Sequence, residues 1–179
     1  MAQPLTHVRA PRTLHVDRPV VRSPHDEPAP RRGPEFVIDD STLNPTTIAL
    51  AAARADVIRL RHGAGLPTYA AVRALVRMLD DEVAAVGRDR DDVLVVLEVE
   101  TVVAADEADA ERRRGHLAYA AAFSHLSWQP GETMIVAPLD ALAVEVDEVV
   151  RRTGVDAVEL ALVGASRRLA PQVTAALTR

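Results

Sequence analysis

The sequence has 179 residues, a formal net charge of −5 and no cysteine. A chain of this length forms one domain of ordinary size, and the lack of cysteine excludes disulfides, thiolate metal sites and a thiol nucleophile. The acidic balance gives no basic face of the kind that nucleic-acid-binding proteins carry. We find no signal peptide and no run of about 18 apolar residues. We therefore expect a cytoplasmic protein that binds neither nucleic acid nor a membrane.

Residues 1–34 differ in composition from the rest of the chain. They contain seven of the twelve prolines and several arginines, with almost no periodic apolar pattern. Such a segment cannot bury enough apolar surface to offset the entropy of ordering it. Acidic residues interleave with the arginines and argue against an anion-binding tail. We predict a Pro- and Arg-rich arm over 1–34, extended or disordered, followed by an α/β domain over 35–179.

From residue 35 onward, short apolar runs alternate with helical patterns. Runs of β-branched and aliphatic residues predict strands over 36–39, 56–60, 93–103, 134–136 and 155–163. Start signals and apolar residues at three- and four-residue spacings predict helices over 45–55, 67–86, 106–123, 138–153 and 166–177. Two of these helices are expected to end at a left-handed glycine, Gly87 and Gly154. Residues 124–132 are expected to form a loop.

The run VLVVLEVETVV over 93–103 is the longest near-continuous aliphatic stretch. It is typical of a strand buried on both faces of a parallel sheet, and Glu98 and Glu100 lie on one face of it. About four βα units in series imply parallel strands with right-handed crossovers. The predicted class is α/β, either a partial TIM-barrel-like sheet or an open curved sheet, with an extended N-terminal arm.

Few residues are candidates for chemistry. Glu98 and Glu100 could act as acid and base or hold a cation, but solvent exposure at an open sheet face is favoured. His62 lies in the loop RHGAGL at a strand end, where open α/β sheets bind ligands, yet a surface histidine in a turn is the favoured interpretation. We assign no catalytic residue and no metal ligand.

Three further residues are weighed in the same way. His116 and His125 lie nine residues apart, without a metal-ligand spacing, and a structural role is favoured for both. Trp128 lies in the predicted loop, where it anchors that loop either on the fold or on a partner.

Four stretches, read in order, resemble a known family. They are TLHVDRPVVRSPHDEPAP, LAAARADVIRL, GRDRDDVLVVLEVETVVAADEADAERR and VAPLDALAVEVDEVVRRTGVDAVEL. Together they resemble the C-terminal half of the bacterial luciferase-like, flavin-dependent monooxygenases, nearest the branch of the nitrilotriacetate and dibenzothiophene-sulfone monooxygenases. The resemblance implies half of a TIM-like barrel, reduced FMN as the cofactor, and oxygenation of a small organic substrate.

The sequence departs from that family after the strand at 36–39. The family has a segment like QAGSSxxG there, whose small residues let backbone amides and a hydroxyl approach the flavin phosphate. Here Asp40 replaces the Gln, Leu43 replaces one Ser, and Thr42 and Thr47 replace the two Gly. A carboxylate repels a phosphate, and Thr does not easily adopt the positive φ that a Gly turn can require. We interpret the following residues as a degenerate flavin-phosphate turn: Asp40, Ser41, Thr42, Asn44 and Thr47.

The leading hypothesis is a truncated domain of this family without independent flavin chemistry, acting as an accessory or remnant subunit. One alternative is an FMN-dependent monooxygenase of a small organic substrate, completed by a second chain. Another is a small-ligand-binding module without a redox role. A half-barrel leaves open edges and an open face, so we expect a homo-oligomer or a second chain to cover the sheet, with Leu97, Glu98 and Val99 near the contact.

Overall fold

The computed structural model describes residues 20–21, 34–123 and 130–177. It has an α/β fold in which parallel strands alternate with helices, so the predicted fold class is confirmed. The strands are β1 Val20–Val21, β2 Glu35–Ile38, β3 Val57–Arg61, β4 Leu94–Ala104, β5 Ile135–Pro138 and β6 Ala157–Leu162.

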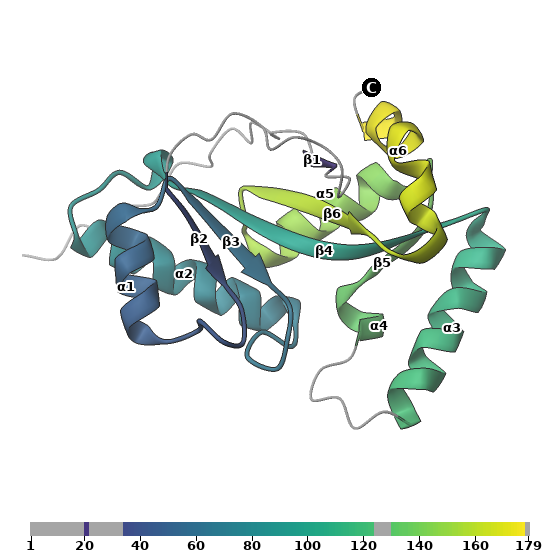
Figure 1. Ribbon diagram of the computed structural model, residues 1–179, viewed down its shortest axis with the longest axis horizontal. Helices are drawn as coiled ribbons and strands as arrows, with labels where there is room; N and C mark the ends of the chain where they lie inside the picture. Colours follow the sequence, from purple (N-terminus) through teal and green to yellow (C-terminus); the bar gives the residue numbers. More distant parts are fainter. Residues whose placement is uncertain (1–19, 22–33, 124–129, 178–179) are drawn as a thin grey trace, which may run out of the picture.

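The sheet is open and centred on β4, in the order β1-β6-β4-β3-β2 (Figure 1). Every pairing is parallel. Because β4 is longer than its neighbours, β3 pairs with its first half and β5 with its last four residues, Thr101–Ala104. Within the described part of the chain, β2 pairs only with β3, and its outer edge is therefore an edge of the sheet.

The helices begin and end largely where the sequence signals predict. The side chain of Asn44 accepts from the amide of Thr47 at the start of α1, with Pro45 in the first helical position. Gly87 and Gly154 follow α2 and α5 with φ of 73° and 76°, the left-handed conformation expected there. The helices are α1 Pro45–Arg54, α2 Tyr69–Ala85, α3 Glu107–Phe123, α4 Pro130–Thr133, α5 Leu142–Thr153 and α6 Ala170–Leu177, with 3₁₀ turns η1 Arg90–Asp92 and η2 Gly164–Leu169.

Three boundaries differ from prediction. Pro138 does not begin a helix but ends β5 opposite Ala104, and α5 begins only at Leu142. A proline is tolerated at a strand end, where no further ladder bond is needed. The last three residues of the predicted loop 124–132 belong to α4, and residues 124–129 lie outside the described residues. The final helix is divided into η2 and α6.

The two faces of the sheet differ in chemistry. Val95, Leu97 and Val99 of β4 are fully or almost fully buried in the main core, which includes apolar residues of α2 and α5. The prediction that β4 is buried on both faces holds only in part, because on the opposite face Val96 is buried, Glu98 is half-buried and Glu100 is exposed. Leu97 and Val99 were also expected near a partner contact, and that placement is wrong because they point into the helix-covered core.

Val20 and Val21, within the predicted arm, form β1 and pair with Glu159 and Leu160 of β6. The predicted arm is extended at these two residues, which add a strand beside β6. Both residues are β-branched, and unlike proline each has a backbone N–H that can donate, which suits an edge strand. The division into an arm and a domain stays a prediction. Within the described residues, no helix is long and apolar enough to span a membrane.

Candidate functional site

The candidate site lies where β2 and β3 end. The turn after β2, residues 39–44, lies against the loop after β3, residues 62–66, and hydrogen bonds join the two. Ligands of open parallel α/β sheets bind outside the carboxyl ends of the strands. The two segments therefore hold the position at which a ligand of this fold is expected.

The turn after β2 is organised by Asp39. Its Oδ1 accepts from the amide and hydroxyl of Ser41, at 2.9 and 2.7 Å, and from the amide of Thr42 at 3.2 Å. The hydrogen bonds from Ser41 are the main reason that the pKa of Asp39 lies below its usual value. The Thr42 hydroxyl also donates to the Val37 carbonyl at 2.9 Å. The polar donors of Ser41 and Thr42 are thus engaged inside the turn.

The turn takes ordinary backbone conformations. Among the described residues no residue other than glycine has a positive φ, so Thr42 and Thr47 carry no strain of that kind. Our expectation that threonine would be unfavourable here concerns only a positive φ, which neither Thr42 nor Thr47 has. Thr47 instead donates its amide to Asn44 Oδ1 and belongs to the start of α1.

Asp40 bridges the two segments. Its Oδ2 accepts from the amide of Ala64 at 2.9 Å and its Oδ1 from the amide of Gly65 at 2.7 Å. A Cβ on Gly63 would lie 2.4 Å from Asp40 Oδ2, and one on Gly65 would lie 2.7 Å from Leu43 Cδ2. The glycines are therefore explained by close approach of the carboxylate and of Leu43 to the backbone rather than by their φ angles.

The side chain of His62 contacts the backbone of the same loop. Its Nδ1 lies 2.9 Å from the Leu66 carbonyl oxygen, so Nδ1 carries the proton and Nε2 is the neutral acceptor. Nε2 is buried and has no hydrogen-bond partner. The ring meets Tyr69 edge-on, with centroids 5.4 Å apart, and the guanidinium of Arg152 lies 4.7 Å from the Tyr69 ring centroid. His62 is half-buried, and the interpretation as a surface histidine is wrong.

Burial lowers the pKa of His62 below 6.5. Between that lowered pKa and 6.5 the unfolded chain binds the proton more strongly than the folded chain. The contribution to stability is therefore complete above 6.5 and is lost as pH falls through this window. When the pH falls from about 7.5 to about 5.5, the free energy of unfolding measured in urea is expected to decrease less in His62→Asn than in the wild type. Equal losses in both would contradict this, and His116→Asn, on the exposed surface of α3, is the control.

Acidic and basic side chains form ion pairs on the face of the sheet opposite the main core. Arg59 of β3 lies between Glu35 of β2, at 2.7 Å, and Glu159 of β6. Arg61 pairs with Glu98 at 3.0 Å. Glu98 is therefore bound to an arginine and Glu100 is exposed, which favours the predicted solvent-facing role over a paired acid and base.

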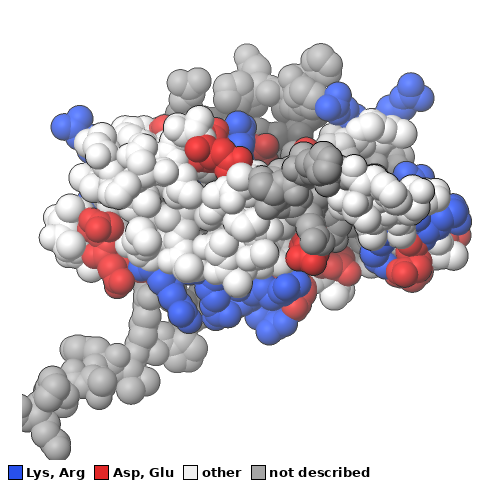
Figure 2. All heavy atoms as spheres, turned by 90° about the horizontal axis from the view of Figure 1, so that it is seen from below, with Lys and Arg blue, Asp and Glu red and all other residues white. Residues whose placement is uncertain are grey.

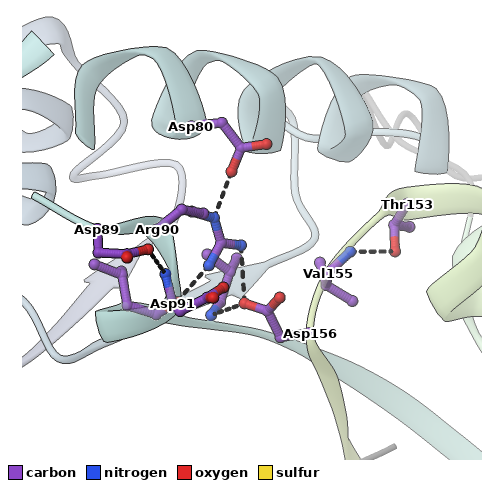
Figure 3. A network of polar contacts seen from close by, with 9 residues as sticks. Asp80, Asp89, Arg90, Asp91, Thr153, Val155 and Asp156 are labelled. Atoms are coloured by element: carbon purple, nitrogen blue, oxygen red, sulfur yellow. Dashed lines mark hydrogen bonds and ion pairs between the residues drawn. The ribbon is translucent and has the colours of Figure 1, made fainter. Parts of the chain in front are cut away.

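A second arginine, partly buried, lies at the amino ends of the strands (Figure 3). Arg90 of η1 points between Asp80 of α2 and Asp156, which precedes β6, and its Nη2 lies 2.8 Å from Asp156 Oδ2. Asp156 Oδ2 also accepts from the amide of Val95 at 2.8 Å. The sequence reasoning missed both arginine clusters, because their partners come from distant segments. The available signal for Arg59 and Glu159 was a charged residue with aliphatic neighbours on both sides, in β3 and in β6.

The remaining candidate residues are His116, His125 and Trp128. His116 is exposed on α3, and His125 and Trp128 lie outside the described residues. Over the described ranges, no group of three or more His, Cys, Asp or Glu is placed to hold a metal ion. On the face shown in Figure 2, most of the surface is uncharged, and residues of both signs lie together at the end formed by α3. There Arg114 pairs with Glu107 and Glu111.

Fold and site together define an open parallel α/β sheet with a ligand position at its carboxyl edge. No family model and no curated protein matches the sequence. EDTA monooxygenase (EmoA) from Chelativorans sp. BNC1 matches in structure with a TM-score of 0.55 and 14% identity, over 75% of this chain and 42% of that chain. DmoA from Hyphomicrobium sulfonivorans matches with a TM-score of 0.56 and 16% identity, over 86% and 42%.

An F420-dependent secondary alcohol dehydrogenase also matches, with a TM-score of 0.58 and 12% identity, over 92% of this chain and 56% of that chain. The chain thus spans about half the length of these three proteins. Identities this low show the fold alone. The chain therefore shares its fold with about half of each of these proteins, whereas membership of the family that it resembles, the particular branch and the assignment to a C-terminal half stay predictions.

Proposed function

We propose that this chain is a truncated domain of the luciferase-like monooxygenase family without independent flavin chemistry, acting as an accessory or remnant subunit. The observation that carries the proposal is the position of Asp40, whose carboxylate accepts from the amides of both Ala64 and Gly65. An anionic group already takes the donors at the carboxyl edge of the sheet. The residues of this turn therefore do not fit the phosphate of FMN.

The neighbouring donors support the same proposal. The amide and hydroxyl of Ser41 and the amide of Thr42 are directed to Asp39. A phosphate at this turn would meet two carboxylates, those of Asp39 and Asp40, at close range, and like charges at such distances repel. The chain also spans 42% and 56% of two of the full-length proteins whose fold it shares.

We further propose that the chain works as a homo-oligomer or with a second chain that covers the open sheet. Two features support this. The outer edge of β2 has no strand beside it within the described residues. The face that an intact barrel would enclose carries Arg61, Glu98 and Glu100, of which Arg61 and Glu100 are exposed. A covering chain would therefore meet a polar face rather than the aliphatic one that we first expected.

Titration of the purified full chain with FMN tests the proposal. We expect no quenching of flavin fluorescence at micromolar concentrations, with an FMN-binding flavoprotein as the positive control. Light scattering on the same sample measures the mass, for which we expect more than the 19.3 kDa of one chain unless the second chain is a different protein. Saturable quenching by the isolated chain would contradict the proposal and favour the FMN-dependent alternative.

A further inference from the structure

We propose that the loop at residues 63–65 is an anion-binding site whose resident anion is the side chain of Asp40, and that removing this carboxylate opens the site to inorganic phosphate and phosphate monoesters. The inference rests on the proposed function, because it names the group that stands in place of a bound phosphate at this turn. It adds that the donor set itself is intact.

The donors converge as they do in an anion site. Two successive amides, those of Ala64 and Gly65, each donate to a different oxygen of one carboxylate, at 2.9 and 2.7 Å. Successive backbone N–H groups that point to one concave position bind anions in many proteins. Gly63 leaves room for the anion, because a Cβ there would lie within 2.6 Å of three carboxyl atoms of Asp40.

The loop is held in shape without Asp40. The amide of Leu66 donates to the Gly63 carbonyl at 3.2 Å, and the amide of Gly63 donates to the Leu66 carbonyl at 3.4 Å. The same Leu66 carbonyl accepts from Nδ1 of His62, which packs against Tyr69. We infer that the two donating amides keep their direction when the carboxylate is removed.

The position is open to solvent. Asp40, Ala64 and Gly65 are all exposed, whereas Gly63 is buried and forms the floor. An ion from solution can therefore reach the amides once the side chain of Asp40 is shortened. The carboxylate of Asp39 is the nearest other charge along the chain, and its bonds to Ser41 and Thr42 fix it within its own turn. Its charge opposes a phosphate and is expected to keep the affinity modest.

The experiment uses the full chain labelled with ¹⁵N and titrated with inorganic phosphate. In Asp40→Ala, the amide resonances of Ala64 and Gly65 are expected to shift together and saturate, with binding at least about tenfold tighter than in the wild type, the gain expected from one charge-assisted contact. Sodium chloride at matched ionic strength is the salt control. Asp140→Ala removes an exposed aspartate elsewhere and is expected to behave like the wild type.

Two outcomes overturn the inference: no response of these amides to phosphate in Asp40→Ala, or an equal response in the wild type. If Asp40→Ala loses the dispersion of a folded spectrum, Asp40→Ser, which also shortens the side chain and removes its charge, carries the same test with the same expected shifts. Failure of the proposed function is distinguishable. FMN bound by the wild type without a shift of Ala64 and Gly65 would contradict the proposed function and leave this inference standing.

Discussion

Replacement of Arg59 by methionine is expected to lower the free energy of unfolding by about 3–5 kcal/mol, the usual cost of removing one partner from a buried ion pair. Arg59 and Glu159 are only 6% and 7% exposed. Burial opposes the charge of Arg59, and the carboxylates of Glu35 and Glu159 outweigh it, so that its pKa is raised. Without the guanidinium, the carboxylate of Glu159 loses this ion pair in a site from which water is largely excluded, and burying a carboxylate without such a partner is costly.

The position of Arg59 makes its loss a loss of sheet geometry as well. Arg59 lies beside Val96 of β4, and Val96 lies beside Ala157 of β6. The guanidinium therefore passes over β4 to reach Glu159 on β6, while its Nε bonds Glu35 on β2. One side chain links the strands on both sides of β4 on the face opposite the main core.

Arg61 provides the matched control. It lies two residues further along the same strand and face, and it pairs with Glu98 of the neighbouring strand at 3.0 Å. Its side chain is 46% exposed, so Arg61→Met is expected to cost no more than about 1 kcal/mol. Urea unfolding followed by circular dichroism measures both variants. Arg59→Met with a loss as small as that of Arg61→Met would show that the buried network does not stabilise the sheet.

A double variant separates the charge from the packing. Arg59→Met combined with Glu159→Leu removes the guanidinium and its buried carboxylate partner, and it is expected to be more stable than Arg59→Met alone because the carboxylate that remains, that of Glu35, is 36% exposed. A double variant that is less stable than Arg59→Met alone would instead assign the loss to side-chain packing over Val96 and Ala157.

Much of the fold was predictable because its signals are local. The Asn44–Pro45 start of α1 and the left-handed Gly87 and Gly154 each depend on a few adjacent residues, and the structure confirms all of them. The alternation within β4 was only partly visible. Its first residues, through Leu97, are apolar at every position, and only Glu98 and Glu100 mark the second face. A run of this kind is typical of strands buried on both sides, which is why the prediction favoured that arrangement.

The position of the candidate site could be predicted from the sequence, but the contacts between its residues could not. A turn after one strand and a glycine loop after the next are expected at the same edge of a parallel sheet. Asp40 was recognised as a substitution unfavourable to phosphate, but its partners lie 24 and 25 residues further along the chain. Arg59 and Glu159 are 100 residues apart. No spacing in one sequence indicates pairs at such separations, because they depend on strand order and register.

Replacement of Arg90 by methionine is expected to lower the free energy of unfolding by about 2–4 kcal/mol, between the cost of a charged hydrogen bond and that of a buried ion pair. Its side chain is 11% exposed and bonds Asp80, Asp156 and the Val93 carbonyl. The two carboxylates are about a quarter exposed, which places the expected cost below that for Arg59.

The loss at Arg90 is expected to be local as well as global. Asp156 accepts from the amide of Val95 at 2.8 Å and donates its own amide to the Val95 carbonyl at 2.9 Å, so this pair begins the pairing of β4 with β6. Arg90 holds the carboxylate that makes the first of these bonds. Hydrogen exchange at the Val95 amide is therefore expected to accelerate in Arg90→Met more than exchange at core amides of β3, since the end of the strand pair opens first.

Arg151 is the control for Arg90, because it also pairs with an acidic residue, Glu148, but is 72% exposed on α5. Arg151→Met is expected to leave both the free energy of unfolding and exchange at Val95 almost unchanged, because an exposed ion pair contributes little. Asp156→Asn keeps an oxygen that can accept from Val95 while removing the charge that faces Arg90, and we expect it to lie between the two. Equal stability of Arg90→Met and Arg151→Met, with unchanged exchange at Val95, would mean that the amino end of the sheet is held by packing of α2 and α5 and not by this ion network.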